Sequence, residues 1–280
     1  MRTAVFKNQV KPDPKKVRVW EQRAPAYDRL CRRWDIFPLL SGRLIDLLPE
    51  NLQGPVLDIG AGSGLTSEIL LARRPHCQAI LIEPSEAMLN IARVNLAGRP
   101  AQFLGMGLDQ AAAGDLRAVA AVASASMQFL DLEPAFAAFA RVVEPGGHLA
   151  FNLWWHHWEK TAALKCMTGW ISAAQAACLQ VHLPPPAADA SSPPKAKTRR
   201  ELTSASREHG FQLVAEHRDE YPTPIGFGVD FEAMDKDWPV KGCRHEDRTA
   251  LLDKMHELAQ GQSEILVSTR FLFRRSTKDR

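Results

Sequence analysis

The sequence predicts an α/β protein with a doubly wound parallel sheet, and two observations lead to this prediction. The first is a glycine-rich segment, residues 55–66, that runs from a short apolar strand through a tight turn into a helix. The second is a regular alternation of apolar strands and amphipathic helices along the following residues. Because strands separated by helices pair in parallel, we expect helices to cover both faces of one sheet.

Each predicted strand is a short apolar run bounded by glycine, proline or polar residues. Pro84 is predicted in the first turn of a helix, where its missing N–H has no partner to lose. Gly210 and Gly261 follow amphipathic segments and are predicted to end helices there. The predicted strands are 56–59, 78–83, 101–104, 119–124, 148–153, 211–219 and 265–274, and the helices between them are 65–73, 84–96, 134–143, 201–209 and 246–260.

The chain is predicted to form a single domain over residues 17–280, preceded by a disordered basic tail over residues 1–16. Apolar residues at helical spacing before the first strand predict an N-terminal helical lid. After the fifth strand a tryptophan-rich helical stripe and a proline-rich stretch predict an inserted cap and a loop. The parts are the lid, 17–50, the core, 51–153, the cap and loop, 154–200, and the C-terminal part of the core, 201–275.

Bulk composition is that of an ordinary globular protein. Of 280 residues, 45% are hydrophobic and 24% charged, and the formal net charge is +3. The sequence contains no run of about twenty apolar residues and no apolar signal core near Met1, so we expect a cytoplasmic protein without a membrane span. The five cysteines form no Cys-x-x-Cys pair and are expected as reduced thiols. Basic clusters near both ends are interpreted as solvated tails, in preference to a nucleic-acid footprint.

The glycine segment has the pattern Asp58-x-Gly60-x-Gly62-x-Gly64, and Glu83 closes the next apolar strand. Glycines let a backbone approach a ligand closely, and a carboxylate at a strand tip accepts hydrogen bonds from ribose hydroxyls. The pattern resembles motif I of class I S-adenosylmethionine-dependent methyltransferases, in their small-molecule branch (UbiE- and BioC-like, types 11 and 25). It fits a dinucleotide fingerprint less well, because that pattern ends in Gly-x-x-Gly.

Two later segments extend the resemblance. Residues 141–147, RVVEPGG, are similar to the turn before the fifth strand of that family. Residues 124–131, SASMQFLD, are similar to its loop after the fourth strand, with Gln128 and Phe129 in place of the usual histidine and tryptophan. The resemblance covers residues 20–153 and returns weakly at 200–275. It implies a Rossmann-like sheet of seven strands whose last strand is antiparallel.

The resemblance also implies a set of residues that bind S-adenosylmethionine. Gly60 and Gly62 would contact its methionine part, Glu83 its ribose, and Met88 and Met106 its adenine. Many relatives have an aspartate in place of Met106, a role that Asp109 could take. Tyr27 would close over the cofactor carboxylate, the alternative being a core-facing helix residue. The full set implied is Tyr27, Asp58, Gly60, Ala61, Gly62, Gly64, Glu83, Pro84, Met88, Met106, Gly107 and Ser124.

Three residues are candidates for the chemistry of transfer. Gln128 cannot take a proton but can orient an acceptor by hydrogen bonding. His156 and His157, at the end of the fifth strand, are the strongest candidates for a general base, since imidazole titrates near neutrality. They remain open to a substrate-orienting or surface role. A metal site is not expected, because adjacent histidines chelate poorly and a third ligand is missing from the pattern. Asp131 and Glu159 are weaker candidates for the base.

Four of the seven tryptophans fall within residues 154–170. They predict either packing of the cap or an aromatic pocket for the acceptor. The expected function is therefore methyl transfer to a small, apolar or aromatic organic acceptor, at oxygen first, then nitrogen or carbon. Two alternatives remain open at this point: an RNA methyltransferase, and a non-catalytic scaffold that binds S-adenosylmethionine. The sequence has neither the Asn/Asp-Pro-Pro-Tyr motif nor a recognisable RNA-binding module, which favours the small acceptor.

Overall fold

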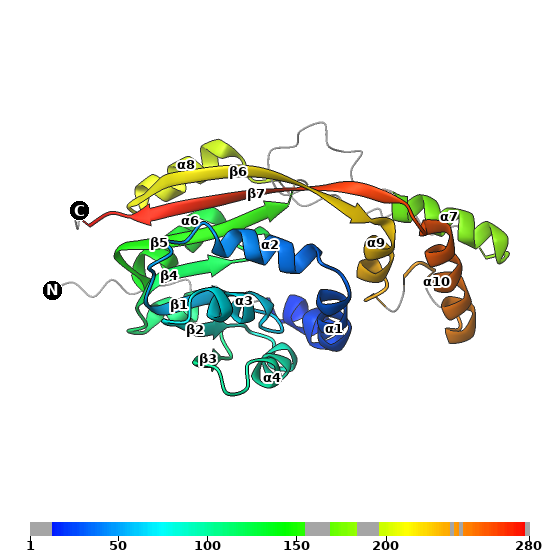
Figure 1. Ribbon diagram of the computed structural model, residues 1–280, viewed down its shortest axis with the longest axis horizontal. Coiled ribbons are helices and arrows are strands. Elements are labelled where there is room, and N and C mark those ends of the chain that lie inside the picture. The colour runs from blue at the N-terminus through cyan, green and yellow to red at the C-terminus, as the bar shows by residue number, and fades with distance from the viewer. Residues whose placement is uncertain (1–12, 155–168, 184–195, 236–237, 241–242, 278–280) are drawn as a thin grey trace.

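The computed structural model describes residues 13–154, 169–183, 196–235, 238–240 and 243–277. A single sheet of seven strands forms its centre (Figure 1). The strand order is β3-β2-β1-β4-β5-β7-β6, and β7 is antiparallel to both of its neighbours. The predicted fold class, with its antiparallel last strand, is confirmed. The strands are β1 (Gly54–Ile59), β2 (Cys77–Ile82), β3 (Ala101–Leu104), β4 (Ala118–Ala123), β5 (Val143–Trp154), β6 (Phe211–Pro224) and β7 (Ser263–Arg275).

Helices cover both faces of the sheet, because adjacent residues of the buried strands point to opposite sides. Val56 packs with residues of α2, α3 and α4, whereas its neighbour Leu57 packs with residues of α5, α6 and α8. The helices are α1 (Pro14–Arg33), α2 (Ile36–Ile45), α3 (Leu65–Arg73), α4 (Glu86–Asn95), α5 (Leu108–Ala113), α6 (Leu132–Val142), α7 (Gly169–Gln180), α8 (Arg199–Glu208), α9 (Ile225–Glu232) and α10 (His245–Ala259).

Several boundaries differ from the sequence-based expectation. Helix α1 begins at Pro14, inside the segment expected as a tail, because Asp13 accepts a hydrogen bond from the Lys15 N–H and caps the helix. Pro84 lies before helix α4, whose N-cap is Ser85. The short helices α5 and α9 were not predicted. Helix α5 has six residues, which is too short to show a helical period, and the apolar residues of α9 alternate with other residues as they do in a strand.

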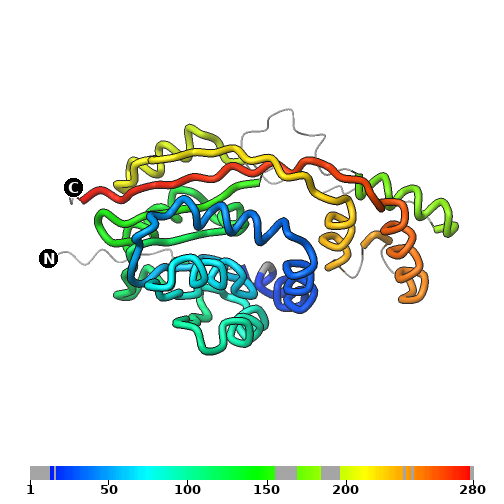
Figure 2. Tube along the Cα trace, viewed as in Figure 1, coloured from blue at the N-terminus to red at the C-terminus, as the bar shows by residue number. Residues whose placement is uncertain are grey.

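A second group of helices lies beyond the end of the sheet. Strands β6 and β7 extend past their neighbours and carry α9 and α10 (Figure 1). These two helices pack with α7 around a small apolar core that includes Ala174, Val229 and Met255. The described cap is therefore built from three segments far apart in the sequence. Helix α1 lies next to α9, between this cap and the core (Figure 2).

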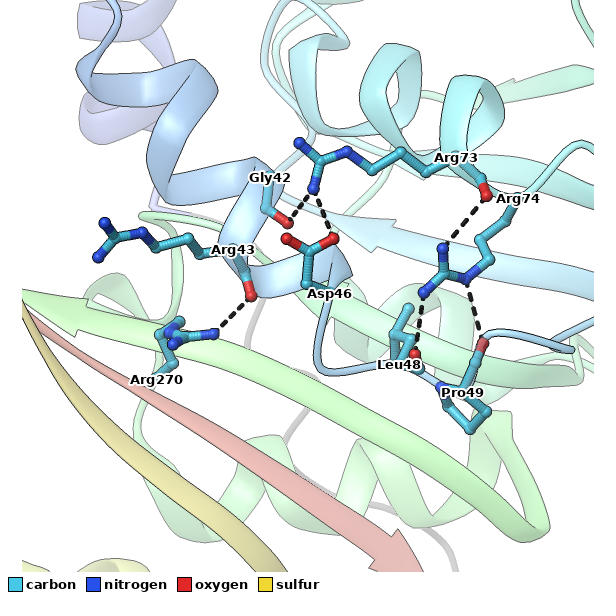
Figure 3. A network of polar contacts seen from close by, with 8 residues as sticks. All are labelled: Gly42, Arg43, Asp46, Leu48, Pro49, Arg73, Arg74 and Arg270. Atoms are coloured by element: carbon cyan, nitrogen blue, oxygen red, sulfur yellow. Dashed lines mark hydrogen bonds and ion pairs between the residues drawn. The ribbon is translucent and has the colours of Figure 1, made fainter.

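Arginine side chains fix α2 to the core. Arg73 donates to the Gly42 carbonyl at 2.7 Å, and Arg270 donates to the Arg43 carbonyl at 2.7 Å (Figure 3). The Gly42 carbonyl also accepts a hydrogen bond from the Asp46 N–H, so Arg73 adds a second bond at this helix C-terminus, where basic side chains are favourable. Arg74 donates to carbonyls of the turn that follows, at Leu48 and Pro49. Helix α2 thus has a fixed position on the face of the sheet that α3 and α4 also cover.

Candidate functional site

The glycine turn after β1 has a backbone shape that other residues rarely adopt. Gly60 and Gly62 have φ angles of +66° and +55°, in the left-handed region. A Cβ atom on Gly60 would lie 2.7 Å from the Ser126 Cβ, and one on Gly62 would lie 3.3 Å from the Tyr27 Cε1. The turn therefore brings bare backbone to the edge of the sheet, against the loop after β4 and against α1.

Glu83 lies directly after β2 and is tied to this turn. Its Oε2 accepts a hydrogen bond from the Gly62 N–H at 3.0 Å, and its Oε1 accepts one from the Ser85 N–H at 2.9 Å. Its exposed fraction is 7%. Burial raises the pKa of the Glu83 carboxyl, and the two N–H donors act in the opposite direction. The carboxylate has a fixed orientation and keeps lone pairs for further donors, as a ribose site requires.

Asp58 supports the glycine turn from its buried side. It is 1% exposed, and its Oδ2 accepts a hydrogen bond from the Ser67 Oγ of α3 at 2.7 Å. Burial raises the pKa of this carboxyl to about 7. Gly64 is the N-cap of α3 and packs against Ala92. Asp58 and Gly64, which the resemblance implied as cofactor contacts, lie outside the residues that line the cleft and act on the turn itself.

One large cleft runs along the carboxyl ends of the strands, with a volume of about 910 Å³. It is in the range of ligand sites in proteins. The residues predicted for the site that line this cleft are Tyr27, Gly60, Gly62, Glu83, Pro84, Met88, Met106, Gly107, Ser124 and Gln128. The structure thus brings together residues of six segments between α1 and the loop after β4. Asp109 lines the same cleft, and burial raises the pKa of its carboxyl.

A second, small cavity of about 20 Å³ adjoins the glycine turn, and its lining includes Tyr27, Ala61 and four serine or threonine side chains. The Ser41 Oγ lies 3.0 Å from the Thr66 Oγ1 and 3.1 Å from the Ser124 Oγ. Tyr27 lines both cavities, and its ring packs edge-on against Trp20 and Phe37. Ala61 contacts this small polar cavity and not the large cleft.

The end of the cleft near the cap has aromatic walls. The Trp20 and Phe129 ring centroids are 6.1 Å apart on one side, and the Trp154 and Phe231 centroids are 6.0 Å apart on the other. Trp170 of α7 also lines this end. Phe231 was missed from the sequence, since α9 was not predicted, although Phe227 and Phe231 have the spacing of one helical turn.

The candidate residues for transfer chemistry fall into two groups. Gln128 lines the cleft, but its Nε2 donates to the Ala125 carbonyl at 2.5 Å. Asp131 lines the cleft as the exposed N-cap of α6. His156, His157 and Glu159 belong to the second group, which lies outside the described residues.

Comparisons with known proteins agree with this geometry. A family model described as a methyltransferase domain matches residues 56–147, from β1 into β5. The structure is similar to the cyclopropane synthase MmaA2 from Mycobacterium tuberculosis, with a TM-score of 0.61 and 14% identity, over 96% of this chain and 100% of that one. It is also similar to the YcgJ protein from Bacillus subtilis, with a TM-score of 0.52 and 13% identity, over 85% of this chain and 98% of that one.

At these identities the likeness to solved structures concerns the fold, while the family model identifies the domain. The match covers the glycine turn and Glu83, which the structure joins by a hydrogen bond. None of the helices in the described residues is long and apolar enough to cross a membrane. With the turn, the carboxylate and the sheet order in place, residues 56–147 form a methyltransferase domain, and the sheet around it has the Rossmann-like fold of class I methyltransferases, which use S-adenosylmethionine as cofactor.

Proposed function

We propose that the protein transfers a methyl group from S-adenosylmethionine to a small apolar or aromatic organic acceptor. The observation that carries this proposal is the continuity of one cleft. It begins at the glycine turn and Glu83 and ends between the aromatic rings of Trp20 and Phe231. A ligand held at the turn and a second ligand held between the rings would therefore lie in contact.

The residues present fit the cofactor. In the proposed arrangement Glu83 accepts hydrogen bonds from the ribose, Met88 and Met106 flank the adenine, and Asp109 accepts from its amino group. Backbone at Gly60 and Gly62 borders the amino-acid part, and a Cβ at these positions would press on Ser126 or Tyr27. When bound, the cofactor supplies an activated methyl group on sulfur. The protein's contribution is alignment and exclusion of water, which accounts for about 7–11 kcal/mol of a barrier in well-oriented reactions.

The charges of the cleft favour an acceptor without negative charge. Among the described residues that line the cleft, Arg23 is the one cationic side chain, and it forms an ion pair with Asp235 at 3.3 Å. An acceptor phosphate or carboxylate would therefore be buried without a dedicated partner, which is costly. A phenol or enol is uncharged at neutral pH and avoids this cost, so we propose oxygen as the attacking atom, ahead of nitrogen and carbon.

A hydroxyl acceptor has to lose its proton during transfer. We propose His156 or His157 as the base for this step. Gln128 is proposed to orient the acceptor through the loop 124–129, since its Nε2 already donates to the Ala125 carbonyl. The cytoplasm is the proposed location. The four described cysteines whose state the structure gives are free thiols, and three of them are buried, which fits a reducing compartment.

Calorimetric titration with S-adenosylmethionine and S-adenosylhomocysteine tests the cofactor site, with NADH as the control ligand. A screen of phenols, amines, carboxylic acids and RNA with methyl-labelled cofactor then tests the acceptor. We expect binding of both sulfur compounds and transfer to uncharged aromatic acceptors. Transfer to RNA alone would overturn the proposed acceptor class, and binding of the product without turnover of any acceptor would support the scaffold alternative.

The aromatic end of the cleft has its own test. Phe231→Ala enlarges that end without altering the glycine turn, so acceptor turnover should fall while the affinity for S-adenosylhomocysteine stays within about threefold. Phe136→Leu is the control for a general loss of packing, because Phe136 lies in the core between the sheet and α6. Equal losses of affinity and turnover in Phe231→Ala would show that this end does not hold the acceptor.

A further inference from the structure

The loop after β4, residues 124–129, contains an unusual backbone conformation. Ala125 has a φ angle of +50°, and among the described residues the other non-glycine residue with positive φ is His182. Such conformations are uncommon for residues with a Cβ and persist where the surroundings determine them. Ala125 lines the large cleft together with its neighbours in the loop. The cause of its conformation is therefore relevant to the site.

Two amide side chains hold the Ala125 backbone. The Asn152 Oδ1 accepts a hydrogen bond from the Ala125 N–H at 2.6 Å, and the Gln128 Nε2 donates to the Ala125 carbonyl at 2.5 Å. Both peptide groups of this residue are thus bonded by side chains, one from β5 and one from the loop itself. Asn152 lies in the interior of β5 with an exposed fraction of 0%.

These bonds are made at a cost to both side chains. In the described part of the chain, the Asn152 Nδ2 and the Gln128 Oε1 are buried without a hydrogen-bond partner. A buried polar atom without a partner lowers stability, and an apolar residue would fill the Asn152 position without that cost. The bond to Ala125 is the polar contact that the Asn152 carboxamide makes among these residues, so its effect is directed at the loop.

The loop in turn shapes the cleft at the glycine turn. The Ser126 Oγ donates to the Ile59 carbonyl at 2.6 Å, directly before Gly60. The Ser126 Cβ occupies the space next to Gly60, where a second Cβ would lie at 2.7 Å. A change in the Ala125 conformation would move Ser124 and Ser126 on either side of it, and both of these residues line the cleft.

We infer that Asn152 is a positioning residue for methyl transfer. It holds Ala125 in the left-handed conformation, and through it sets the wall of the cleft that the loop 124–129 provides against the glycine turn. The inference rests on the proposed function, because it takes this cleft as the cofactor site. Asn152 itself does not line the cleft and is not a catalytic residue.

Calorimetric binding of S-adenosylhomocysteine is the readout, since it needs no known acceptor. Asn152→Leu removes the acceptor atom and keeps the branched shape with the same number of heavy atoms, and we expect at least a tenfold loss of affinity. Ala125→Gly in the same chain should restore the affinity to within threefold of wild type, because glycine adopts positive φ without help. A purely structural role of Asn152 in β5 would not respond to a change at Ala125.

Ser268→Ala is the matched control. Ser268 is also fully buried, on the neighbouring strand β7, and its Oγ bonds the Leu153 carbonyl instead of the loop. Its removal should leave the affinity unchanged. If Asn152→Leu does not fold, Asn152→Ala replaces it in the same pair of measurements.

Wild-type affinity in the Asn152 variant would overturn the inference, and so would a loss of affinity that Ala125→Gly does not restore. Absence of binding by the wild-type protein is a different result. It would overturn the proposed function, and the positioning role would fall with it.

Discussion

The Glu83 carboxylate accepts a hydrogen bond from the Gly62 N–H at 3.0 Å, so the acidic residue after β2 and the glycine turn after β1 form one unit. The two residues are 21 positions apart and come from neighbouring parallel strands. The bond fixes one carboxylate oxygen and the shape of the turn together. A change at either residue should therefore affect the whole cofactor site.

Glu83→Gln should weaken the binding of S-adenosylhomocysteine by about 10- to 100-fold. The glutamine amide group would direct a donor toward one of two N–H groups that now donate to the carboxylate, at Gly62 or Ser85. Calorimetric titration measures the loss. Glu86→Gln, an exposed residue three positions later, is the control and should bind normally. Equal affinities for both variants would rule out Glu83 as the ribose ligand.

Gly60→Val or Gly62→Val should abolish cofactor binding and leave the protein folded. At Gly60 the valine would combine a left-handed backbone, which costs about 1–2 kcal/mol, with a collision at Ser126. Gly98→Val separates these two effects, because Gly98 has a φ angle of +75° and open space around it. The Gly98→Val variant should lose a similar amount of stability, because its valine also has a left-handed backbone. Its affinity for S-adenosylhomocysteine should stay normal. Normal affinity in either turn variant would argue against the site.

Asp58→Asn should change the dependence of stability on pH. The pKa of Asp58 is raised to about 7 in the folded protein, so between pH 4 and pH 7 the folded state binds a proton that the unfolded state has lost. The contribution of Asp58 to the free energy of unfolding is therefore fully present at low pH. It falls by up to about 4 kcal/mol as the pH rises. Urea unfolding at pH 5 and pH 7.5 should show a smaller decline in Asp58→Asn. Parallel declines in both proteins would contradict the prediction.

Asp230→Asn should loosen the contact between α1 and the cap. Asp230 accepts hydrogen bonds from Trp34 at 2.7 Å and from His256 at 2.9 Å. Burial raises its pKa, but these two donors and the Arg33 guanidinium at 3.0 Å together outweigh burial and lower the pKa below its usual value. We expect a loss of about 2 kcal/mol at pH 7. Asp247→Asn, at an ion pair on the surface of α10, should cost less than about 0.5 kcal/mol.

The pH dependence of the stability of Asp230→Asn tests whether the charge of Asp230 causes this loss. A carboxyl with a lowered pKa contributes stability above its unfolded pKa of about 3.9 and loses it as pH falls through the folded value. The difference between wild type and Asp230→Asn in urea unfolding should therefore shrink below about pH 4. A constant difference down to pH 3 would show that the charge of Asp230 is not the source of the effect.

The order of strands from β1 to β5, and the helices between them apart from α5, could be predicted from the sequence, because apolar period and glycine spacing are local properties. The same holds for the glycine turn and Glu83. The support of the turn by the buried Asp58 could not be predicted. Asp58 reads as a ligand in a motif, and only burial beside Ser67 shows that it bonds to α3 instead. His156 and His157 stay predictions, since they lie outside the described residues.

The composition of the cap also could not be predicted from the sequence. Its helical stripe was predicted for one inserted segment, whereas the described cap combines α7 with α9 and α10, which follow β6 and precede β7. Which apolar faces meet is decided by packing between distant segments, and no local pattern records it. Phe231 entered the cleft in this way.

By itself, the sequence determined the sheet, the bare turn at its edge and the carboxylate beside it, because each depends on residue types at short spacing. The tertiary structure decided which aromatic rings face that turn and which buried amide holds the loop next to it. These depend on contacts between residues far apart in the chain, such as Asn152 and Ala125, whose meeting is fixed only when β4 and β5 pair.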